Sequence, residues 1–236
     1  MTPRPNPGTV LLFDIDGTLV LTGGAGGRAM TRAFEDLYGI PNAFEGIPFN
    51  GRTDSWIVSR AAAAHAIDGA ALSRFKPRYL DYLAEELRKP GPRKGVMPGI
   101  NPLLDSLVQR DDVFVALLTG NYELGARLKL EHFDLWRYFA CGAFGDTTHD
   151  RNGLLSEALA RVAACGGPQA APADTVIIGD TPLDVAVAVT GGARSIAVAT
   201  GSHTTDELRE SGADVVFEDL SDLEAVLAAL QGRAES

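Results

Sequence analysis

Four apolar runs in this chain show no alternation of polar and apolar residues, and each ends abruptly in polar residues or glycine. They cover residues 10–13, 113–118, 176–178 and 195–199. A strand with one solvated face would alternate, so runs of this kind are typical of parallel strands that are buried on both faces. Residues 215–217 predict a further strand at an edge. The sequence therefore predicts a mostly parallel sheet.

Helical patterns fill the intervals between the later runs. Leu155, Leu159 and Val162 have helical spacing, and Thr181 with Pro182 has the residue types of a helix start. A Ser-x-x-Glu arrangement that begins at Ser221 predicts a capping box before the last helix. Because strands and helices alternate, we expect a doubly wound α/β sheet.

One stretch, between about residue 20 and residue 95, breaks this alternation and contains no convincing strand. It shows apolar residues at helical spacing instead, and glycines at both ends predict hinges. We expect a core of residues 1–20 and 96–236 and an inserted, all-helical cap of residues 21–95. The three helical stripes of the insert are Ala29, Ala33 and Leu37; Trp56, Ile57 and Ala61; and Phe75, Tyr79, Leu83 and Leu87.

Composition and charge narrow the class of protein. The chain has 236 residues, is 45% hydrophobic and carries a formal net charge of -10. It can bury a core, and its acidity disfavours binding to the phosphate backbone of nucleic acids. No run approaches the roughly 18 apolar residues of a membrane span, and the N-terminus lacks the apolar segment of a signal peptide. We therefore expect a cytoplasmic protein that binds neither nucleic acid nor membranes.

Polar side chains follow three of the predicted strands. Asp14 and Asp16 come directly after the first, Thr119 and Asn121 after the second, and Asp180 after the third. The carboxyl ends of parallel strands meet at one edge of an open sheet, where ligands bind. The sequence therefore predicts that these distant residues form a single site.

The carboxylates of this predicted site indicate a cation. Asp14, Asp16 and Asp180 provide hard oxygen ligands, and Asp184 adds a fourth carboxylate. Mg²⁺ prefers such ligands, together with water and phosphate oxygens. Asp184 also forms a Thr-x-x-Asp arrangement with Thr181, which predicts a helix-capping role that is compatible with a role at the metal.

Three motifs carry a resemblance to a known family. The segment DIDGTL at residues 14–19 is similar to the DxDGT(L/V) signature of haloacid dehalogenase (HAD)-like phosphatases. TGN at residues 119–121 and GDTPLD at residues 179–184 look like the second and fourth motifs of that superfamily. The resemblance covers nearly the whole chain. It implies a HAD-like Rossmannoid core with a helical, C1-type cap, as in the phosphoglycolate-phosphatase-like branch.

The resemblance also implies a two-step mechanism. Asp14 would attack phosphorus and form an aspartyl-phosphate, and Asp16 would protonate the leaving oxygen and then deprotonate the attacking water. Thr119 would donate to a phosphoryl oxygen within the substrate-binding loop of Thr119, Gly120 and Asn121. Mg²⁺ would be held by Asp14, the backbone carbonyl of Asp16 and Asp180, with Asp184 as an indirect or alternate ligand.

The third family motif, a basic residue that is usually lysine, departs from the pattern here. Residues 145–153 contain no lysine. Arg151 lies about where that lysine is expected, and its guanidinium fork can clamp a phosphate. Lys129, in the helix after Thr119, competes for the role, and we favour Arg151. The segment GRTD at residues 51–54 is similar to a cap-loop motif, which implies that Arg52 reaches the leaving group or a carboxylate of the substrate.

The expected function is Mg²⁺-dependent hydrolysis of a small phosphorylated metabolite. Dehalogenases of 2-haloacids in the same superfamily lack the second aspartate, so Asp16 argues against their chemistry. Two alternatives stay open: a phosphomutase of the same fold, and a catalytically silent regulator that binds phosphate or metal. The sequence leaves phosphoglycolate, sugar phosphates and nucleotides open as substrates, and it gives no indication of oligomeric state.

Overall fold

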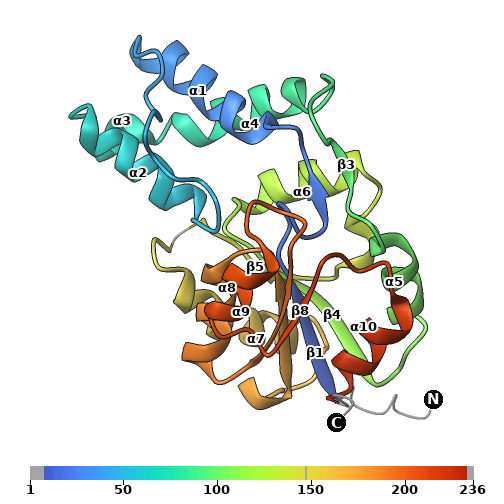
Figure 1. Ribbon diagram of the computed structural model, residues 1–236. Helices are drawn as coiled ribbons and strands as arrows, with labels where there is room; N and C mark the ends of the chain where they lie inside the picture. Colours follow the sequence, from blue (N-terminus) through green and yellow to red (C-terminus); the bar gives the residue numbers. More distant parts are fainter. Residues whose placement is uncertain (1–7, 147, 233–236) are drawn as a thin grey trace.

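A six-stranded parallel sheet forms the centre of the larger domain in the computed structural model, which describes residues 8–146 and 148–232. The strand order is β5-β4-β1-β6-β7-β8. The strands are β1 (Thr9–Phe13), β4 (Val113–Leu118), β5 (Gly142–Ala143), β6 (Thr175–Gly179), β7 (Arg194–Val198) and β8 (Val215–Phe217). Helices lie on both sides of this sheet (Figure 1). The predicted doubly wound α/β fold is confirmed.

The buried strands explain the apolar runs. On β1, Leu11 and Phe13 pack into one hydrophobic cluster, and Val10 and Leu12 pack into another. The first cluster lies under α5 (Ile100–Leu107), α6 (Glu123–His132) and α10 (Leu223–Leu230). The second lies under α7 (Leu154–Ala164) and α8 (Pro182–Gly191). Because both faces of the strand are buried, no position on it faces solvent, and polar and apolar residues do not alternate along it.

Of two predicted helix starts, the structure confirms one and corrects the other. Thr181 caps α8 in a complete capping box with Asp184, as predicted. The capping box predicted at Ser221 is wrong, because the N-cap of α10 is Asp222, whose carboxylate accepts from the backbone N–H of Ala225. A carboxylate one residue later satisfies the same orphan N–H groups of the first turn.

The inserted segment folds around its own hydrophobic cluster. It contains α1 (Ala25–Tyr38), α2 (Asp54–Ala64), the short α3 (Gly69–Leu72) and α4 (Phe75–Glu86), so the three predicted stripes lie on helices, except that Leu87 directly follows α4. The chain leaves the core through β2 (Val20–Leu21) and returns through β3 (Gly95–Val96), which pair antiparallel. This arrangement supports the proposed division into a core and a cap of residues 21–95. The two short strands at its ends, which include Leu21 and Gly95, depart from the all-helical expectation.

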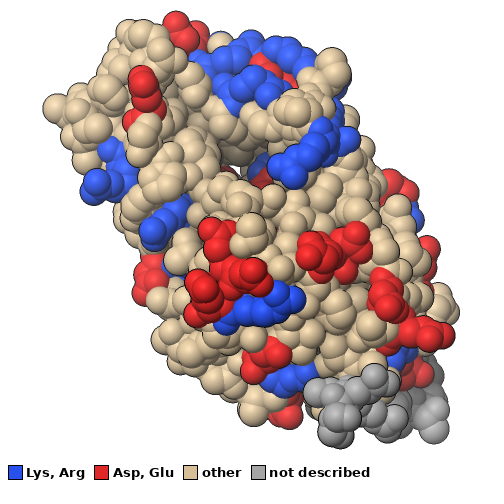
Figure 2. Space-filling view, in the orientation of Figure 1, with Lys and Arg blue, Asp and Glu red and all other residues tan. Residues whose placement is uncertain are grey.

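The cap stands over the carboxyl ends of the strands (Figure 1). Within the cap, the buried carboxylate of Glu86 receives ion pairs from Arg28, Arg32 and Lys89, which ties α1 to α4. Figure 2 shows basic side chains gathered over this end of the molecule. The ion pairs of Glu86 hold together the helices that cover the site.

The remaining described elements connect the layers. They are α9 (Thr205–Glu210) and the 3-10 turns η1 (Trp136–Tyr138), η2 (Arg151–Gly153) and η3 (Pro172–Asp174). Among the residues that the structure describes, no helix combines the length and the apolar character needed to cross a membrane.

Candidate active site

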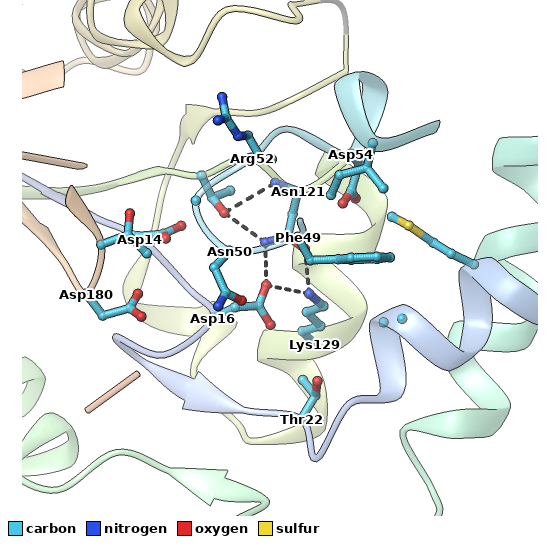
Figure 3. A pocket seen from close by; sticks show the side chains of 18 of the residues that line it. Asp14, Asp16, Thr22, Phe49, Asn50, Arg52, Asp54, Asn121, Lys129 and Asp180 are labelled. Carbon is cyan, nitrogen blue, oxygen red and sulfur yellow. Dashed lines mark hydrogen bonds and ion pairs between the residues drawn. The ribbon is translucent and has the colours of Figure 1, made fainter. Parts of the chain in front are cut away.

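A cavity of about 230 Å³ lies between the carboxyl ends of the strands and the cap. Figure 2 shows a hollow between the two domains, and Figure 3 shows the cavity from close by. The predicted convergence is therefore present in the fold. The predicted site residues that line the cavity are Asp14, Asp16, Arg52, Thr119, Gly120, Asn121, Lys129, Arg151 and Asp180.

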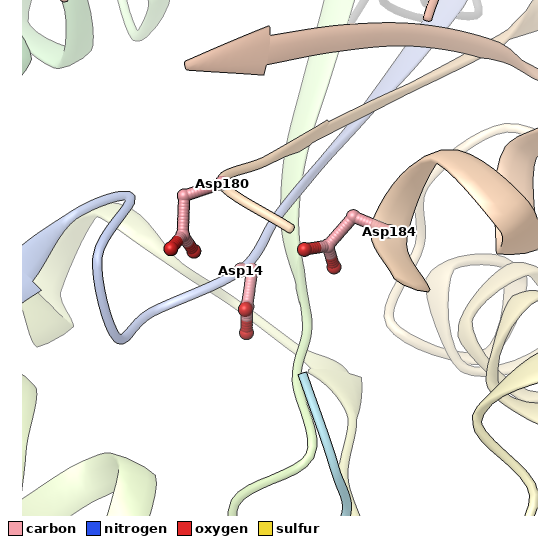
Figure 4. A group of neighbouring side chains, drawn as sticks. All are labelled: Asp14, Asp180 and Asp184. Atoms are coloured by element: carbon pink, nitrogen blue, oxygen red, sulfur yellow. The ribbon is translucent and has the colours of Figure 1, made fainter. Parts of the chain in front are cut away.

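Three buried carboxylates form a cluster at one side of this cavity. Asp14 follows β1, Asp180 follows β6, and Asp184 lies in the first turn of α8. One carboxylate oxygen of each lies within 4.8 Å of the other two (Figure 4). The backbone N–H of Asp14 donates to the carbonyl of Ile178 at 2.9 Å, so β6 holds Asp14 in register.

The loop that joins β1 to β2 requires glycine at position 17. Gly17 has a φ of +88°, and a Cβ at this position would lie 2.3 Å from Oδ2 of Asp180. Any other residue would be strained and would displace that carboxylate. The hydroxyl of Thr18 donates to Oδ1 of Asp180 at 3.2 Å. The DIDGT segment therefore positions Asp180 as well as its own aspartates.

Because these carboxylates are buried and repel one another, it is energetically unfavourable for all three to be ionised without a cation beside them. Burial raises the pKa of Asp14 to about 6; the guanidinium of Arg151 opposes that rise, and Asp184 adds to it. Burial, followed by the charges of Asp184 and Asp14, raises the pKa of Asp180 well above its ordinary value. A hard divalent cation would relieve both effects, and the all-oxygen donor set fits Mg²⁺.

Asp184 differs from the other two carboxylates because both of its oxygens are engaged. Oδ2 accepts from the backbone N–H of Thr181 at 3.1 Å and from its hydroxyl at 2.7 Å. Oδ1 accepts from Nη2 of Arg151. Asp184 thus has the capping role that the sequence predicted, and it also positions the arginine.

The two cations that competed for the basic role both lie in the site, on different carboxylates. Nη2 of Arg151 lies 3.0 Å from Oδ2 of Asp14, and Nη1 donates to the carbonyl of Gly51 in the cap loop at 3.0 Å. Nζ of Lys129 donates to Oδ2 of Asp16 at 2.5 Å. Both side chains are buried, and Arg151 is the one beside the predicted nucleophile.

Asn121 connects the loop after β4 to Asp16. Its Nδ2 donates to Oδ2 of Asp16 at 2.8 Å and to Oγ1 of Thr119 at 2.8 Å. Its Oδ1 accepts from Nζ of Lys129 at 2.6 Å (Figure 3). Since the hydroxyl oxygen of Thr119 accepts from Asn121, its proton can be donated to a ligand.

The cap loop lies directly on this segment. The backbone N–H of Asp54 donates to the carbonyl of Gly120 at 2.7 Å. A Cβ at Gly120 would lie 2.2 Å from the backbone oxygen of Arg52, so only glycine permits this approach. The side chain of Arg52 is exposed at the rim of the cavity, with its guanidinium 4.7 Å from the ring centroid of Trp56.

Comparison with known proteins decides the family. Residues 11–188 match the model of the haloacid dehalogenase-like hydrolase family. The chain belongs to this family. The match contains all three motifs and the whole cap, so this HAD-like protein is an enzyme of the hydrolase class.

Two curated proteins and a solved structure are similar over most of this HAD-like chain. The probable phosphatase IndB of Dickeya dadantii is 27% identical, with 94% of each chain covered. The phosphoglycolate phosphatase of Rhodospirillum rubrum is 29% identical, over 90% of this chain and 88% of the relative. A predicted phosphoglycolate phosphatase from Haemophilus somnus has the same fold, with a TM-score of 0.68, 17% identity, and 95% and 100% coverage.

Two residues of this HAD-like site were not predicted as site residues from the sequence. Asp54 is buried, and its carboxylate accepts from the backbone N–H of Tyr122 at 2.9 Å. Tyr79 is fully buried and lines the cavity. The sequence signal for Asp54 was its place beside Arg52 in the cap-loop motif. Tyr79 stood in a regular apolar stripe, which gives no sign of a function for its hydroxyl.

Proposed function

We propose that this HAD-family hydrolase is a Mg²⁺-dependent phosphatase that hydrolyses a small phosphate monoester through an aspartyl-phosphate on Asp14. The observation that carries the proposal is the buried cluster of Asp14, Asp180 and Asp184 with Arg151 beside Asp14. The similarity to a probable phosphatase and to a phosphoglycolate phosphatase supports the same chemistry.

Asp14, Asp180 and the backbone carbonyl of Asp16 would hold the metal. When bound, Mg²⁺ would neutralise charge on the phosphoryl oxygens and favour in-line attack on phosphorus. Asp184 is assigned an indirect role, because Thr181 and Arg151 already engage its two oxygens.

Asp14 is assigned as the nucleophile, and Arg151 as the basic residue that binds the transferring phosphoryl group. Nη2 of Arg151 lies 3.0 Å from Oδ2 of Asp14, so its charge lies where the phosphoryl group would be bonded. Thr119 donates a hydrogen bond from its hydroxyl to a phosphoryl oxygen. Donors that are fixed before the reaction stabilise the developing charge without reorganisation.

Asp16 is assigned as general acid and then general base. It gives its proton to the leaving oxygen and later takes a proton from the water that hydrolyses the intermediate. Asn121 and Lys129 both donate to its Oδ2, so they hold the carboxylate in one orientation. Lys129 is therefore assigned a positioning role on Asp16 rather than the phosphate-binding role.

The size of the cavity favours a small leaving group. Its volume of about 230 Å³ is below the roughly 300–1,000 Å³ of pockets for drug-sized ligands. This supports a phosphoglycolate-phosphatase-like activity on a small metabolite, with the cap covering the ester during turnover.

Phosphate release from a panel of small esters, in Mg²⁺ and in EDTA, tests the proposal. We expect turnover in Mg²⁺ that is lost in EDTA and in Asp14→Asn, and retained in Asp206→Asn, which removes a carboxylate that is 84% exposed. A folded, Mg²⁺-binding protein that releases no phosphate from any ester would contradict the proposal and favour a silent regulator. Accumulation of a bisphosphorylated sugar in place of free phosphate would indicate a phosphomutase.

A further inference from the structure

The hydroxyl of Tyr79 is the feature of the cavity that the proposed mechanism leaves unused. The side chain is fully buried, and its oxygen has no hydrogen-bond partner among the residues that the structure describes. A buried polar group without a partner is destabilising compared with an apolar group of the same shape. Phenylalanine would fill the same space at a lower cost, so the hydroxyl requires an explanation.

The ring of Tyr79 is fixed by its neighbours. It is stacked with Phe75, with centroids 6.1 Å apart, and it meets the ring of Tyr122 edge to face at 6.0 Å. The position of the hydroxyl oxygen is therefore fixed, and the residue lines the cavity. Burial raises the pKa of this hydroxyl well above its ordinary value, followed by the nearby charges of Asp54 and Asp16, so the group keeps its proton.

The hydroxyl lies on the acid-base side of the site. A Cβ placed on Gly26 would lie 3.9 Å from the Tyr79 oxygen and 3.6 Å from Nζ of Lys129. Lys129 in turn donates to Asp16, which is assigned to protonate the leaving oxygen. Glycine at position 26 thus leaves room for about one carbon atom, in van der Waals contact with both the Tyr79 hydroxyl and the ammonium group. This space belongs to the leaving group, because Asp14 and Arg151 lie at the phosphoryl side.

The cavity is partly apolar. Met30, Phe49 and Ile57 line it from the cap, and Figure 3 labels Phe49 among the lining side chains. A polar group placed among apolar side chains selects ligands by a single directed contact. The donors on one side and the carbon surface on the other fit a short leaving group that carries an oxygen-containing group.

We propose that the Tyr79 hydroxyl donates a hydrogen bond to a hydroxyl or carboxylate oxygen carried by the leaving group, and so selects oxygenated small esters. The inference rests on the proposed phosphatase function and adds a specificity-determining residue to it. A site built to donate to an oxygen discriminates strongly against an analogue that lacks it, because its own buried group is then left unpaired.

Tyr79→Phe, compared with the wild type on three esters, tests this. The esters are 2-hydroxyethyl phosphate, phosphoglycolate and ethyl phosphate, which carry a hydroxyl, a carboxylate and neither. We expect kcat/KM to fall about tenfold for an ester whose hydroxyl is bound and up to about a hundredfold for a carboxylate. For ethyl phosphate it should change less than about twofold, and the melting temperature should be equal or higher.

Tyr38→Phe is the matched control, because its hydroxyl donates within the cap to the carbonyl of Ala71 at 3.0 Å. It should affect all three esters alike. An equal effect of Tyr79→Phe on the three esters, or no loss on either oxygenated ester, would overturn the inference while leaving the phosphatase function intact.

Equilibrium binding separates this inference from the proposed function. In an Asp14→Asn background, which cannot form the phosphoenzyme, Tyr79→Phe should weaken binding of the oxygenated esters and leave that of ethyl phosphate unchanged. This measurement needs no turnover, so it tests the role of Tyr79 even if the wild type hydrolyses none of the three esters. Equal affinities of the two proteins for an oxygenated ester would contradict the inference.

Discussion

The free energy of unfolding should fall as the pH rises, because Asp54 then becomes charged at a buried position between the cap and the core. Asp54 is buried between the cap and the loop after β4, and burial raises the pKa of its carboxyl to about 7, against the opposing charge of Lys129. A carboxyl whose pKa is higher in the folded than in the unfolded state favours folding at low pH. That contribution is lost as the pH rises from about 4 to about 7.

Asp54→Asn removes this dependence. An asparagine oxygen can still accept from the backbone N–H of Tyr122, which lies 2.9 Å from the aspartate oxygen. Between about pH 5 and about pH 8, we expect the free energy of unfolding of the variant to rise by about 3 kcal/mol relative to the wild type. Any constant effect of the new amide, including the lost attraction to the charge of Lys129, cancels in this difference between two pH values.

Urea unfolding of both proteins in EDTA measures the four free energies that are needed. Asp14 and Asp180 titrate in both proteins, so their contributions largely cancel. Asp81→Asn, which removes a carboxylate that is 69% exposed from the same cap, should change stability by less than about 0.5 kcal/mol at either pH. A difference between Asp54→Asn and wild type that is the same at both pH values would refute the reasoning.

Four further predictions concern the site. Gly120→Ala should lower kcat/KM about a hundredfold, because its Cβ would lie 2.2 Å from the backbone oxygen of Arg52 and push the cap loop outward; unchanged kinetics would contradict this close approach. Arg151→Met should lower kcat by about a hundredfold to a thousandfold, since it removes the cation beside the nucleophile. In Lys129→Met, kcat should fall less for p-nitrophenyl phosphate, whose leaving group needs little protonation, than for an alkyl ester; an equal fall would argue against its positioning role. Mg²⁺ at about a hundred times its Kd should stabilise the wild type by about 2.7 kcal/mol in thermal unfolding, and Asp180→Asn should lose most of that gain.

The sequence predicted the parts of the fold that depend on burial alone. The runs that became β1, β4, β6 and β7 are buried on both faces, so their composition shows directly what surrounds them. β5 escaped prediction because Gly142–Ala143 is only two residues long and is held by pairing to β4. α9, with six residues and a mostly charged sequence, buries only Leu208, and its one local signal, the capping box of Thr204 and Glu207, was not used in the prediction. A strand as short as β5 depends on tertiary contacts that leave little trace in the local sequence.

The candidate site shows the same limit at the level of side chains. The convergence of Asp14, Thr119 and Asp180 follows from topology, because every parallel strand delivers its end to the same edge. The separation of Arg151 and Lys129 onto different carboxylates depends on where the fold places η2 and α6 relative to the loop after β1, and no spacing rule gives that. The position of the Tyr79 hydroxyl likewise depends on how the ring packs against Phe75 and Tyr122, and the regular apolar spacing of the sequence does not reveal that.

Identification of the phosphorylated residue tests the central assignment most directly. With enzyme in excess over a hydrolysable ester, rapid acid quenching and peptide mass spectrometry should find one phosphoryl group on the peptide that contains Asp14. The Asp14→Asn protein should yield no such peptide and no phosphate. Turnover at the wild-type rate without Asp14, or a phosphoryl group attached to a different residue during turnover, would contradict the account.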